Sequence, residues 1–419
     1  MTASVETMSS SPTTVKALTS ARGVEAWHVE SDVVPLIAVS FIFEGGSAHD
    51  PADKPGVAQM LARLLDEGAG EYDSDAFQER LAAHAIELSF NAGNDALGGS
   101  LKTLVKHADE AFELLRLALA EPRFDQDSIE RVRAQTIAGL KYQQNDPGVM
   151  ATRRFFEEGF AGHPYGRPTS GTPESVAAIT RDDLIDMHKA IIARGRVKVA
   201  VVGAIGSDNL SVLLDKVFGS LPEAEALSII EPASLQMLGS RIVVDLDVPQ
   251  SVIRFGMNGI AWRDPGFIPA YVLNHILGGG AFTSRLFQEV REKRGLAYSV
   301  YSYASHYADT GQVALYVGTR PDNVGEALDV IGSELRRLVD DGVTEEELDR
   351  ARDNVKGRTV LSMESTLTRM NRLGSSLLMG VPILTVDELL ASFDAVTMED
   401  VMTLARELFA PDRLSAAGI

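Results

Sequence analysis

The most informative segment of the sequence reads Gly278-Gly-Gly-Ala-Phe-Thr-Ser-Arg-Leu-Phe-Gln-Glu-Val-Arg-Glu-Lys-Arg-Gly-Leu-Ala-Tyr298. Its three glycines predict a loop at which the backbone can closely approach another chain. A helix is expected to follow, and Gly295 suits the left-handed residue that ends a helix. A strand over residues 297–304 then completes a loop–helix–strand unit.

Part of this segment has a counterpart in the first half of the chain, because Ser284-Arg-Leu-Phe-Gln-Glu-Val-Arg291 echoes Ser74-Asp-Ala-Phe-Gln-Glu-Arg-Leu81. Two further pairs follow in the same order and at nearly the same offset: Ile129-Glu-Arg-Val-Arg133 with Leu348-Asp-Arg-Ala-Arg352, and Thr180-Arg-Asp-Asp183 with Thr397-Met-Glu-Asp400. Both Thr-x-x-Asp stretches resemble the capping box that starts a helix. The shared order indicates an internal duplication.

The duplication divides the chain into two halves with similar expected structure. Residues 1–20 are expected to be a disordered tail, 21–221 an N-terminal αβ domain, 222–239 a linker and 240–419 a C-terminal αβ domain. The linker carries two prolines and several acidic residues without sustained helical periodicity.

Within each half, expected strands alternate with long amphipathic helices. The first half contains strands over 37–43 and 197–203, and the second contains strands over 242–247 and 414–418. The predicted fold class is α+β, with helices packed on one face of a mostly antiparallel sheet in each half. Two such layers joined by a linker would face each other across a cavity.

Composition excludes several classes of function. The formal net charge of −20 argues against a nucleic-acid partner, because phosphate binding requires clustered Lys and Arg. The chain has no cysteine, so disulfides, thiolate catalysis and Cys-ligated metals are excluded. The longest apolar run, residues 33–43, is too short to span a membrane. The first residues lack the apolar core of a signal peptide, which fits the cytoplasm, but a chain whose signal peptide had been removed would look the same and would be periplasmic, so the sequence leaves the compartment open.

Two hydrogen-bond donors, Arg291 and Tyr298, are expected at the end of the predicted helix and the start of the strand that follows. A guanidinium and a neutral phenol both donate at pH 7. Two converging donors suit a peptide carbonyl that becomes an oxyanion during hydrolysis. The residues alone leave open the alternative of a surface Arg and a strand Tyr that serve stability.

The spacing of Arg291 and Tyr298 resembles the Arg/Tyr signature of the pitrilysin and mitochondrial-processing-peptidase family, the inverzincin metallopeptidases. The resemblance covers nearly the whole chain and includes the duplicated αβ domains and the stretch His163-Pro-Tyr-Gly166. It implies that Arg291 and Tyr298 reach substrate held at zinc in an N-terminal half. The glycines of the expected substrate-binding loop are Gly278, Gly279 and Gly280.

The zinc site of that family uses H-x-x-E-H on a helix, in which two His bind the metal and the Glu is the general base. The matching helix here is Gly56-Val-Ala-Gln-Met-Leu-Ala-Arg-Leu-Leu65. Gln59 and Arg63 stand at the His positions and Ala62 at the base position. The distant Glu ligand falls at Gly139, or within one or two residues of it. Gln is a poor ligand and a cationic Arg repels Zn²⁺, so this chain is expected to bind no metal.

The resemblance therefore implies a catalytically incomplete subunit of a heterodimeric zinc metallopeptidase. Its partner would be a homologous chain that carries H-x-x-E-H and the zinc, its substrates would be peptides, and the two chains would form a clam shell. Two alternatives remain at this stage: a non-enzymatic scaffold of the same family, and a stand-alone peptide-binding clamp. The family's edge strand corresponds to Ser89-Phe-Asn-Ala-Gly93.

Overall fold

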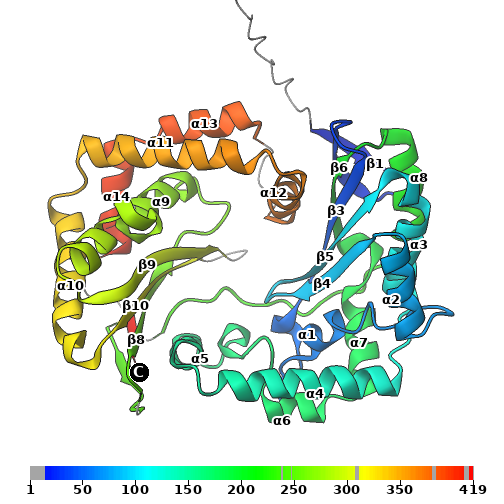
Figure 1. Ribbon diagram of the computed structural model, residues 1–419, viewed down its shortest axis with the longest axis horizontal. Coiled ribbons are helices and arrows are strands. Elements are labelled where there is room, and N and C mark those ends of the chain that lie inside the picture. Colours follow the sequence, from blue (N-terminus) through cyan, green and yellow to red (C-terminus); the bar gives the residue numbers. More distant parts are fainter. Residues whose placement is uncertain are drawn as a thin grey trace, which may run out of the picture.

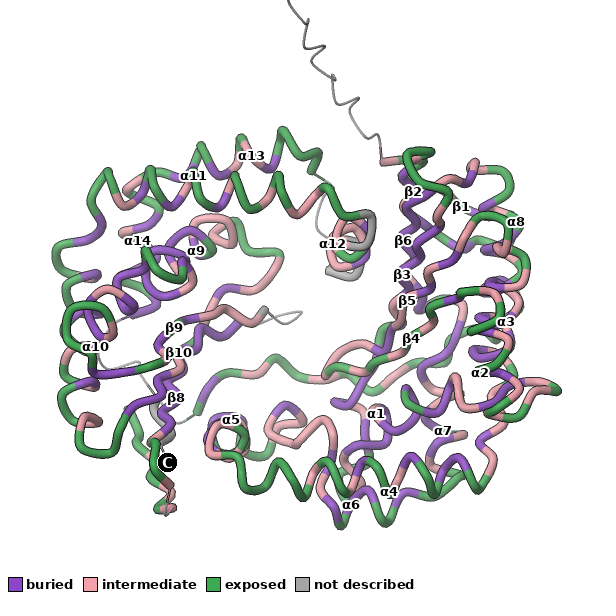
Figure 2. The backbone as a smooth tube through the Cα atoms, in the orientation of Figure 1, coloured by how far each residue is buried: buried purple, intermediate pink, exposed green. Residues whose placement is uncertain are grey.

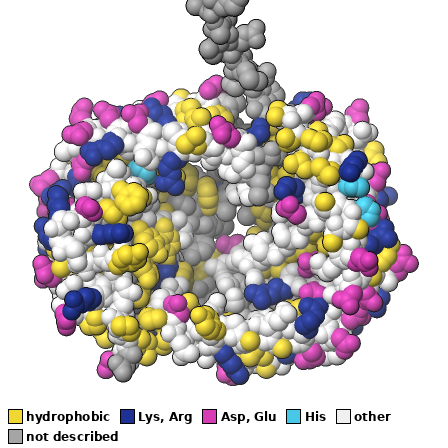
Figure 3. Space-filling model, viewed as in Figure 1, with side chains coloured by type: hydrophobic (Ala, Val, Ile, Leu, Met, Phe, Trp, Pro, Cys, Tyr) yellow, Lys and Arg dark blue, Asp and Glu magenta, His cyan; other side chains and the backbone are white. Residues whose placement is uncertain are grey.

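The computed structural model describes residues 15–236, 239–246, 248–306, 311–379, 384–409 and 415–418. Two β-sheets lie on opposite sides of the molecule, and most helices cover the outer faces of the sheets (Figure 1). The central strands of both sheets are largely buried, and the outermost strands are more exposed (Figure 2). The face in view is hollowed between the two halves (Figure 3).

The first sheet has six strands in the order β1-β2-β6-β3-β5-β4. All neighbouring strands are antiparallel except β2 and β6, which are parallel. The strands are β1 Lys16–Thr19, β2 Glu25–Glu30, β3 Leu36–Glu44, β4 Glu87–Ala92, β5 Ala96–Leu104 and β6 Val197–Gly203.

The second sheet has five strands in the order β7-β11-β8-β10-β9, again with one parallel pair, β7 and β11. Its strands are β7 Arg241–Val243, β8 Ser251–Gly259, β9 Ala297–His306, β10 Gly311–Thr319 and β11 Ser415–Gly418. Taken in chain order, β7 to β11 occupy the same places as β2 to β6 in the first sheet. The duplication and the α+β class predicted from the sequence are confirmed at the level of topology.

The helices follow the same repeat. In the first half they are α1 Val57–Ala62, α2 Ser74–Ala83, α3 Ala108–Ala120, α4 Gln126–Gln143, α5 Pro147–Gly159, α6 Pro173–Ala178, α7 Arg181–Ile191 and α8 Ser207–Val217. In the second half they are α9 Phe267–Asn274, α10 Val324–Asp340, α11 Glu345–Ser362, α12 Thr366–Met379, α13 Val386–Asp394 and α14 Met398–Leu408.

Repeated residues perform the same structural task in both halves. Thr180 and Thr397 cap α7 and α14 in complete capping boxes, each with Asp at the third helical position. In α4, Arg133 donates to the carbonyls that end α6, at Val176 and Ile179. Its counterpart Arg352 in α11 donates to the carbonyl of Val396, just after α13. The sequence repeat therefore reflects a repeated set of hydrogen bonds.

The two halves exchange one helix each, which was not predicted. Helix α12 of the second half packs on β3 and β6 of the first sheet, and α5 of the first half packs on β8 and β11 of the second. Met370 of α12 is completely buried against β2, β3 and β6. Both exchanged helices lie on the inner faces, beside the central hollow (Figure 1). Each sheet is thus covered on its outer face by its own half and partly on its inner face by the other.

The boundaries differ from expectation at three places. Strand β1 occupies Lys16–Thr19, so the expected tail is wrong for these residues, which pair with β2; residues 1–14 lie outside the described residues. The strand expected over 242–247 is shortened to β7, and residue 247 is not described. Residues 222–236 contain no helix or strand. Two histidines hold this stretch, because His49 and His163 bond the carbonyls of Ser228 and Glu231.

No helix within the described ranges combines the length and the apolar character that a membrane crossing requires.

Candidate functional site

The helix expected to carry the degenerate zinc motif is α1, and this segment packs into the core of the first half. Val57, Met60, Leu61, Leu64 and Leu65 are all buried in the core of the first half. Ala62 is completely buried in the same core. The helix ends at Ala62, and Arg63 is its C-terminal cap. The base position is therefore occupied by a methyl group enclosed by apolar side chains.

The residues at the two His positions make structural hydrogen bonds. The Oε1 atom of Gln59 accepts from the backbone N–H of Ala92 in β4, at 3.3 Å. The Nη1 atom of Arg63 donates to the hydroxyl of Thr136 in α4, at 3.3 Å. The same two positions that would otherwise meet at a metal ion thus connect α1 to a strand on one side and to a helix on the other.

The position of the distant ligand lies on α4, one turn beyond Thr136. Gly139 is exposed, and no atom lies within 4 Å of the point where a Cβ would stand. No acidic residue lies between Glu130 and Asp146. A set of Gln, Ala, Arg and Gly offers neither the charge nor the donors that Zn²⁺ requires. Among the described residues, no three His, Cys, Asp or Glu side chains come together in a way that would hold a metal ion.

Asp50 positions α1 and was not identified from the sequence. Its two carboxylate oxygens accept from the N–H groups of Gly56 at 2.7 Å and Ala58 at 2.8 Å, at the start of the helix. Burial raises the pKa of Asp50 to about 6, although these hydrogen bonds and Arg167 act in the opposite direction. An acidic residue shortly before a helix was the available signal, since such residues commonly satisfy its first N–H groups.

Arg291 and Tyr298 lie together in the second half. The guanidinium of Arg291 lies over the ring of Tyr298, 5.0 Å from its centroid, and over the ring of Phe287, 4.9 Å from its centroid. The Tyr298 side chain is 74% exposed, at the beginning of β9. Both rings contact the cation through cation–π interactions. Phe287 lies four residues before Arg291, a spacing that would have allowed this contact to be predicted.

The segment that carries Arg291, from Phe287 to Glu292, is a π-helix. The expectation of a regular α-helix is wrong for these residues. Single π-helical turns are often found at functional sites. Arg285 fixes the start of the segment, because it donates to both carboxylate oxygens of Glu347 at 2.7 Å and to the carbonyl of Gly342. Glu289 pairs with Lys293 and Arg294 near its end. The backbone that carries Arg291 is therefore supported at both ends.

The ion pair of Arg285 and Glu347 predicts a pH dependence of stability. Burial raises the pKa of Glu347, but the hydrogen bonds from Arg285 and Thr344 outweigh burial and lower it to about 2. A lowered carboxyl pKa stabilises the fold above the ordinary pKa, about 4.5, and this contribution is lost as pH falls toward 2. The difference corresponds to roughly 3 kcal/mol. We expect Glu347→Gln to lose this acid sensitivity, measured by urea unfolding between pH 6 and pH 3.

The matched control for this experiment is Glu346→Gln. Glu346 is on the same helical turn but is exposed, and its ion pair is with the exposed Arg350. Its substitution is expected to leave the acid dependence of the unfolding free energy unchanged. A wild-type protein and a Glu347→Gln variant with parallel pH profiles would contradict the assignment.

The glycine run does not form the expected loop. Residues His275–Gly279 form a π-helix, and Gly280 ends it. Gly278 and Gly280 are buried, and a Cβ on Gly278 would stand 2.5 Å from the backbone nitrogen of Ser302 in β9. The close backbone approach predicted for these glycines therefore takes place, but within the chain. An open loop at Gly278, Gly279 and Gly280 is a wrong expectation.

The expected edge strand is present. Among the described residues, strand β4 pairs with β5 alone, and its other side is the edge of the sheet. Because Gln59 accepts from the N–H of Ala92, that N–H points away from β5, as do the backbone groups of Phe90 and Leu88 by the alternation of an antiparallel strand. Gln59 thus occupies one end of the open edge and leaves its central part available.

Comparison with known proteins agrees with this architecture. Residues 29–173 match the model of insulinase, peptidase family M16, and residues 178–355 match that of the peptidase M16 inactive domain. An uncharacterised zinc protease of Streptomyces coelicolor is 33% identical over 87% of this chain and 80% of its own length. A non-peptidase homologue of Helicobacter pylori is 26% identical over 89% of this chain and 86% of its own.

Among solved structures, a peptidase M16 inactive domain from Pseudomonas fluorescens superimposes with a TM-score of 0.91 at 27% identity. It covers 96% of this chain and 97% of its own. The agreement extends over both halves and both sheets. The two family models, the relatives and the shared fold together establish that this chain belongs to peptidase family M16.

Proposed function

We propose that this chain is the zinc-lacking subunit of a heterodimeric metallopeptidase of family M16. Its partner is a homologous chain with an intact H-x-x-E-H motif and bound zinc. The two chains close as a clam shell around a peptide, and Arg291 and Tyr298 bind the substrate carbonyl at the partner's zinc site. The chain contributes binding and orientation, while the partner contributes the metal and the general base.

One observation carries the proposal: two donors are placed side by side in the half opposite a site that does not fit zinc. The phenol of Tyr298 is exposed, and the guanidinium of Arg291 lies over two aromatic rings. A scaffold has no use for an exposed phenol beside a preorganised guanidinium. Preorganised donors aimed at a developing oxyanion are, in contrast, a main source of rate acceleration in acyl transfer.

The proposal is tested by reconstitution. The purified chain, a zinc-bearing family M16 chain from the same organism and their mixture are assayed for hydrolysis of a fluorogenic peptide and for zinc content. We expect no stoichiometric zinc and no hydrolysis in the first, and zinc-dependent hydrolysis well above the partner's own level in the mixture. Tight zinc binding and peptide cleavage by this chain alone would overturn the proposal. A stable complex with no gain in hydrolysis would favour the scaffold.

A further inference from the structure

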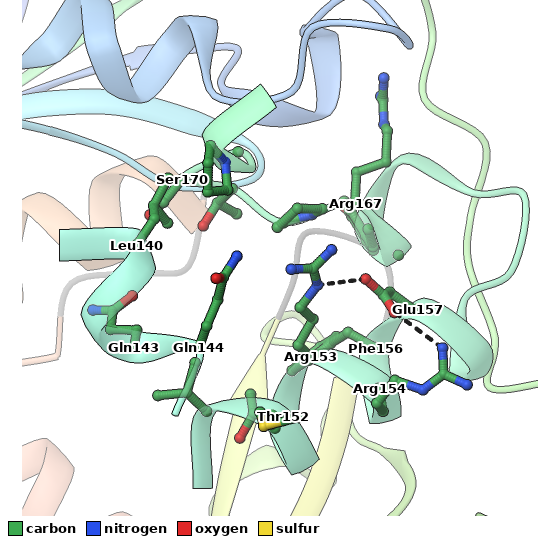
Figure 4. A pocket seen from close by; sticks show the side chains of 18 of the residues that line it. Leu140, Gln143, Gln144, Thr152, Arg153, Arg154, Phe156, Glu157, Arg167 and Ser170 are labelled. Carbon is green, nitrogen blue, oxygen red and sulfur yellow. Dashed lines mark hydrogen bonds and ion pairs between the residues drawn. The ribbon is translucent and has the colours of Figure 1, made fainter. Parts of the chain in front are cut away.

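A cavity of about 560 Å³ lies between α4, α5 and the loop 165–171, outside the site described above (Figure 4). Its volume is within the range of small-ligand sites. The turn between β4 and β5 reaches it through Asn94. Because Asn94 follows the last residue of β4, the cavity lies beyond the C-terminal end of this strand.

The walls of the cavity carry positive charge in a strongly acidic chain. Three Arg but only one Glu line it, although the whole chain has a net charge of −20. The terminal nitrogens of Arg167 already have acceptors, because they donate to the carbonyls of Ala48 and Asp50. Arg153 and Arg154 remain, and both pair with Glu157.

The guanidinium of Arg153 is directed into the cavity, toward the carboxamide of Gln144 (Figure 4). Its Nε atom donates to Glu157 at 2.6 Å, and within the described part of the chain its two terminal nitrogens have no hydrogen-bond partner. Arg154 approaches Glu157 from the opposite side (Figure 4), and it also pairs with Glu158 at 3.2 Å. The cavity therefore presents a guanidinium face with two donors in the geometry that a carboxylate accepts.

The remainder of the lining is suited to an apolar group. It includes the side chains of Leu140, Met150, Phe156, Pro168 and Pro173. Gln143, Gln144 and Asn94 add amides that can bond a peptide backbone. A ligand that matches these walls has a carboxylate, at least one amide and an apolar side chain.

We propose that this cavity binds the carboxyl-terminal residue of a peptide. The terminal carboxylate accepts two hydrogen bonds from Arg153, and the apolar side chain of the last residue contacts the apolar wall. Gln59 covers the β4 edge at Ala92, next to this cavity, so the last residue is recognised by the walls of the cavity alone and not as part of a strand added to β4. Such a site captures peptides that carry a free terminal carboxylate, a group that every cleavage of a peptide bond creates.

The inference goes beyond the proposed role of Arg291 and Tyr298, because it concerns the first half and needs neither a partner nor zinc. The test accordingly uses the chain alone. Binding of an N-acetylated pentapeptide that ends in leucine is measured by isothermal titration calorimetry, once as the free acid and once as the carboxyl-terminal amide. We expect the acid to bind about tenfold more tightly, since one charge-assisted pair distinguishes the two.

Three substitutions identify the residue responsible. Arg153→Met, which keeps an apolar stem, is expected to bring the affinity for the acid down to that for the amide. Arg154→Met, on the same helix and with the same Glu157 partner, is expected to leave both affinities unchanged. Glu157→Gln releases Arg153 and is expected to tighten binding of the acid several-fold, a gain that misfolding cannot produce.

Equal affinity for the acid and the amide would overturn the proposal, as would an Arg153→Met variant that still prefers the acid. Binding of octanoate as tight as that of the peptide acid would overturn the assignment to peptides. A negative result in these binding measurements would not contradict the proposed heterodimeric peptidase, and a negative reconstitution result would not contradict peptide binding in the cavity.

Discussion

Replacing Arg291 with Ala is expected to lower the turnover of the complex with a zinc-bearing partner by about 10²- to 10³-fold. This is the usual cost of removing one preorganised donor to an oxyanion. The guanidinium contacts the rings of Phe287 and Tyr298, which favour its orientation before substrate binds. The loss should therefore appear in kcat as well as in kcat/KM. The measurement is steady-state hydrolysis of a fluorogenic peptide by the reconstituted pair.

Two substitutions of Tyr298 separate the hydroxyl from the ring. Tyr298→Phe removes only the donor and preserves the ring on which Arg291 lies, so a loss similar to that of Arg291→Ala is expected. Tyr298→Ala also removes one support of the guanidinium, and a larger loss is expected. Arg320→Ala is the control and should leave turnover unchanged, because Arg320 is an exposed cation of the second half whose ion pair is with Asp322. Full activity after both Arg291→Ala and Tyr298→Phe would exclude the proposed role.

The fold could be predicted largely because the duplication is visible in local sequence. The Thr-x-x-Asp pairs specify helix starts, and Arg133 and Arg352 recur because both bond the end of a neighbouring helix. The exchange of α5 and α12 could not be predicted in the same way. Amphipathic periodicity shows that a helix has an apolar face, but it does not show which sheet that face contacts.

The loss of the zinc site could be predicted from the sequence because it depends on residue type. Whatever the orientation of their side chains, Gln, Ala and Arg provide neither good zinc ligands nor a general base. The bonds that replaced it depend on tertiary structure: Gln59 to Ala92 and Arg63 to Thr136 join segments far apart in sequence. The open loop expected at the glycine run was a wrong prediction for a related reason. Glycines predict a close backbone approach, but local sequence does not say whether the approaching chain is a substrate or, as here, β9.

The second large effect is expected where an exchanged helix meets the opposite sheet. Gly256 is buried in β8, directly beneath the ring of Phe155 in α5. A Cβ at this position would stand 2.0 Å from the Cζ atom of Phe155 and 2.6 Å from its Cε2 atom. Phe155 is completely buried, so its ring has no free space to move into. We expect Gly256→Ala to lower the free energy of unfolding by about 3 kcal/mol, the upper range of overpacking in a core.

A double-mutant cycle tests whether this contact is the cause. Phe155→Ala alone should cost about 3–5 kcal/mol, because it leaves a cavity. In the double variant the new methyl group of residue 256 enters that cavity, so the combined loss should be smaller than the sum by about 1–2 kcal/mol. The measurement is urea unfolding. Gly357→Ala is the control, because it lies on α11 with no atom within 4 Å of a new Cβ, and it should be neutral or stabilising.

The two tryptophans report which half responds. Trp27 lies in β2 of the first half and Trp262 lies in the second. Each tryptophan is replaced by Phe in turn, so that the fluorescence of the other one reports the unfolding of its own half. Without a further substitution the two transitions should coincide, because α5 and α12 connect the halves in both directions. In Gly256→Ala the transition reported by Trp262 should move to lower urea concentration than that reported by Trp27, since α5 is displaced from the second sheet while α12 still covers the first. Strictly additive losses with coincident transitions would show that the contact of Phe155 with Gly256 does not couple the halves.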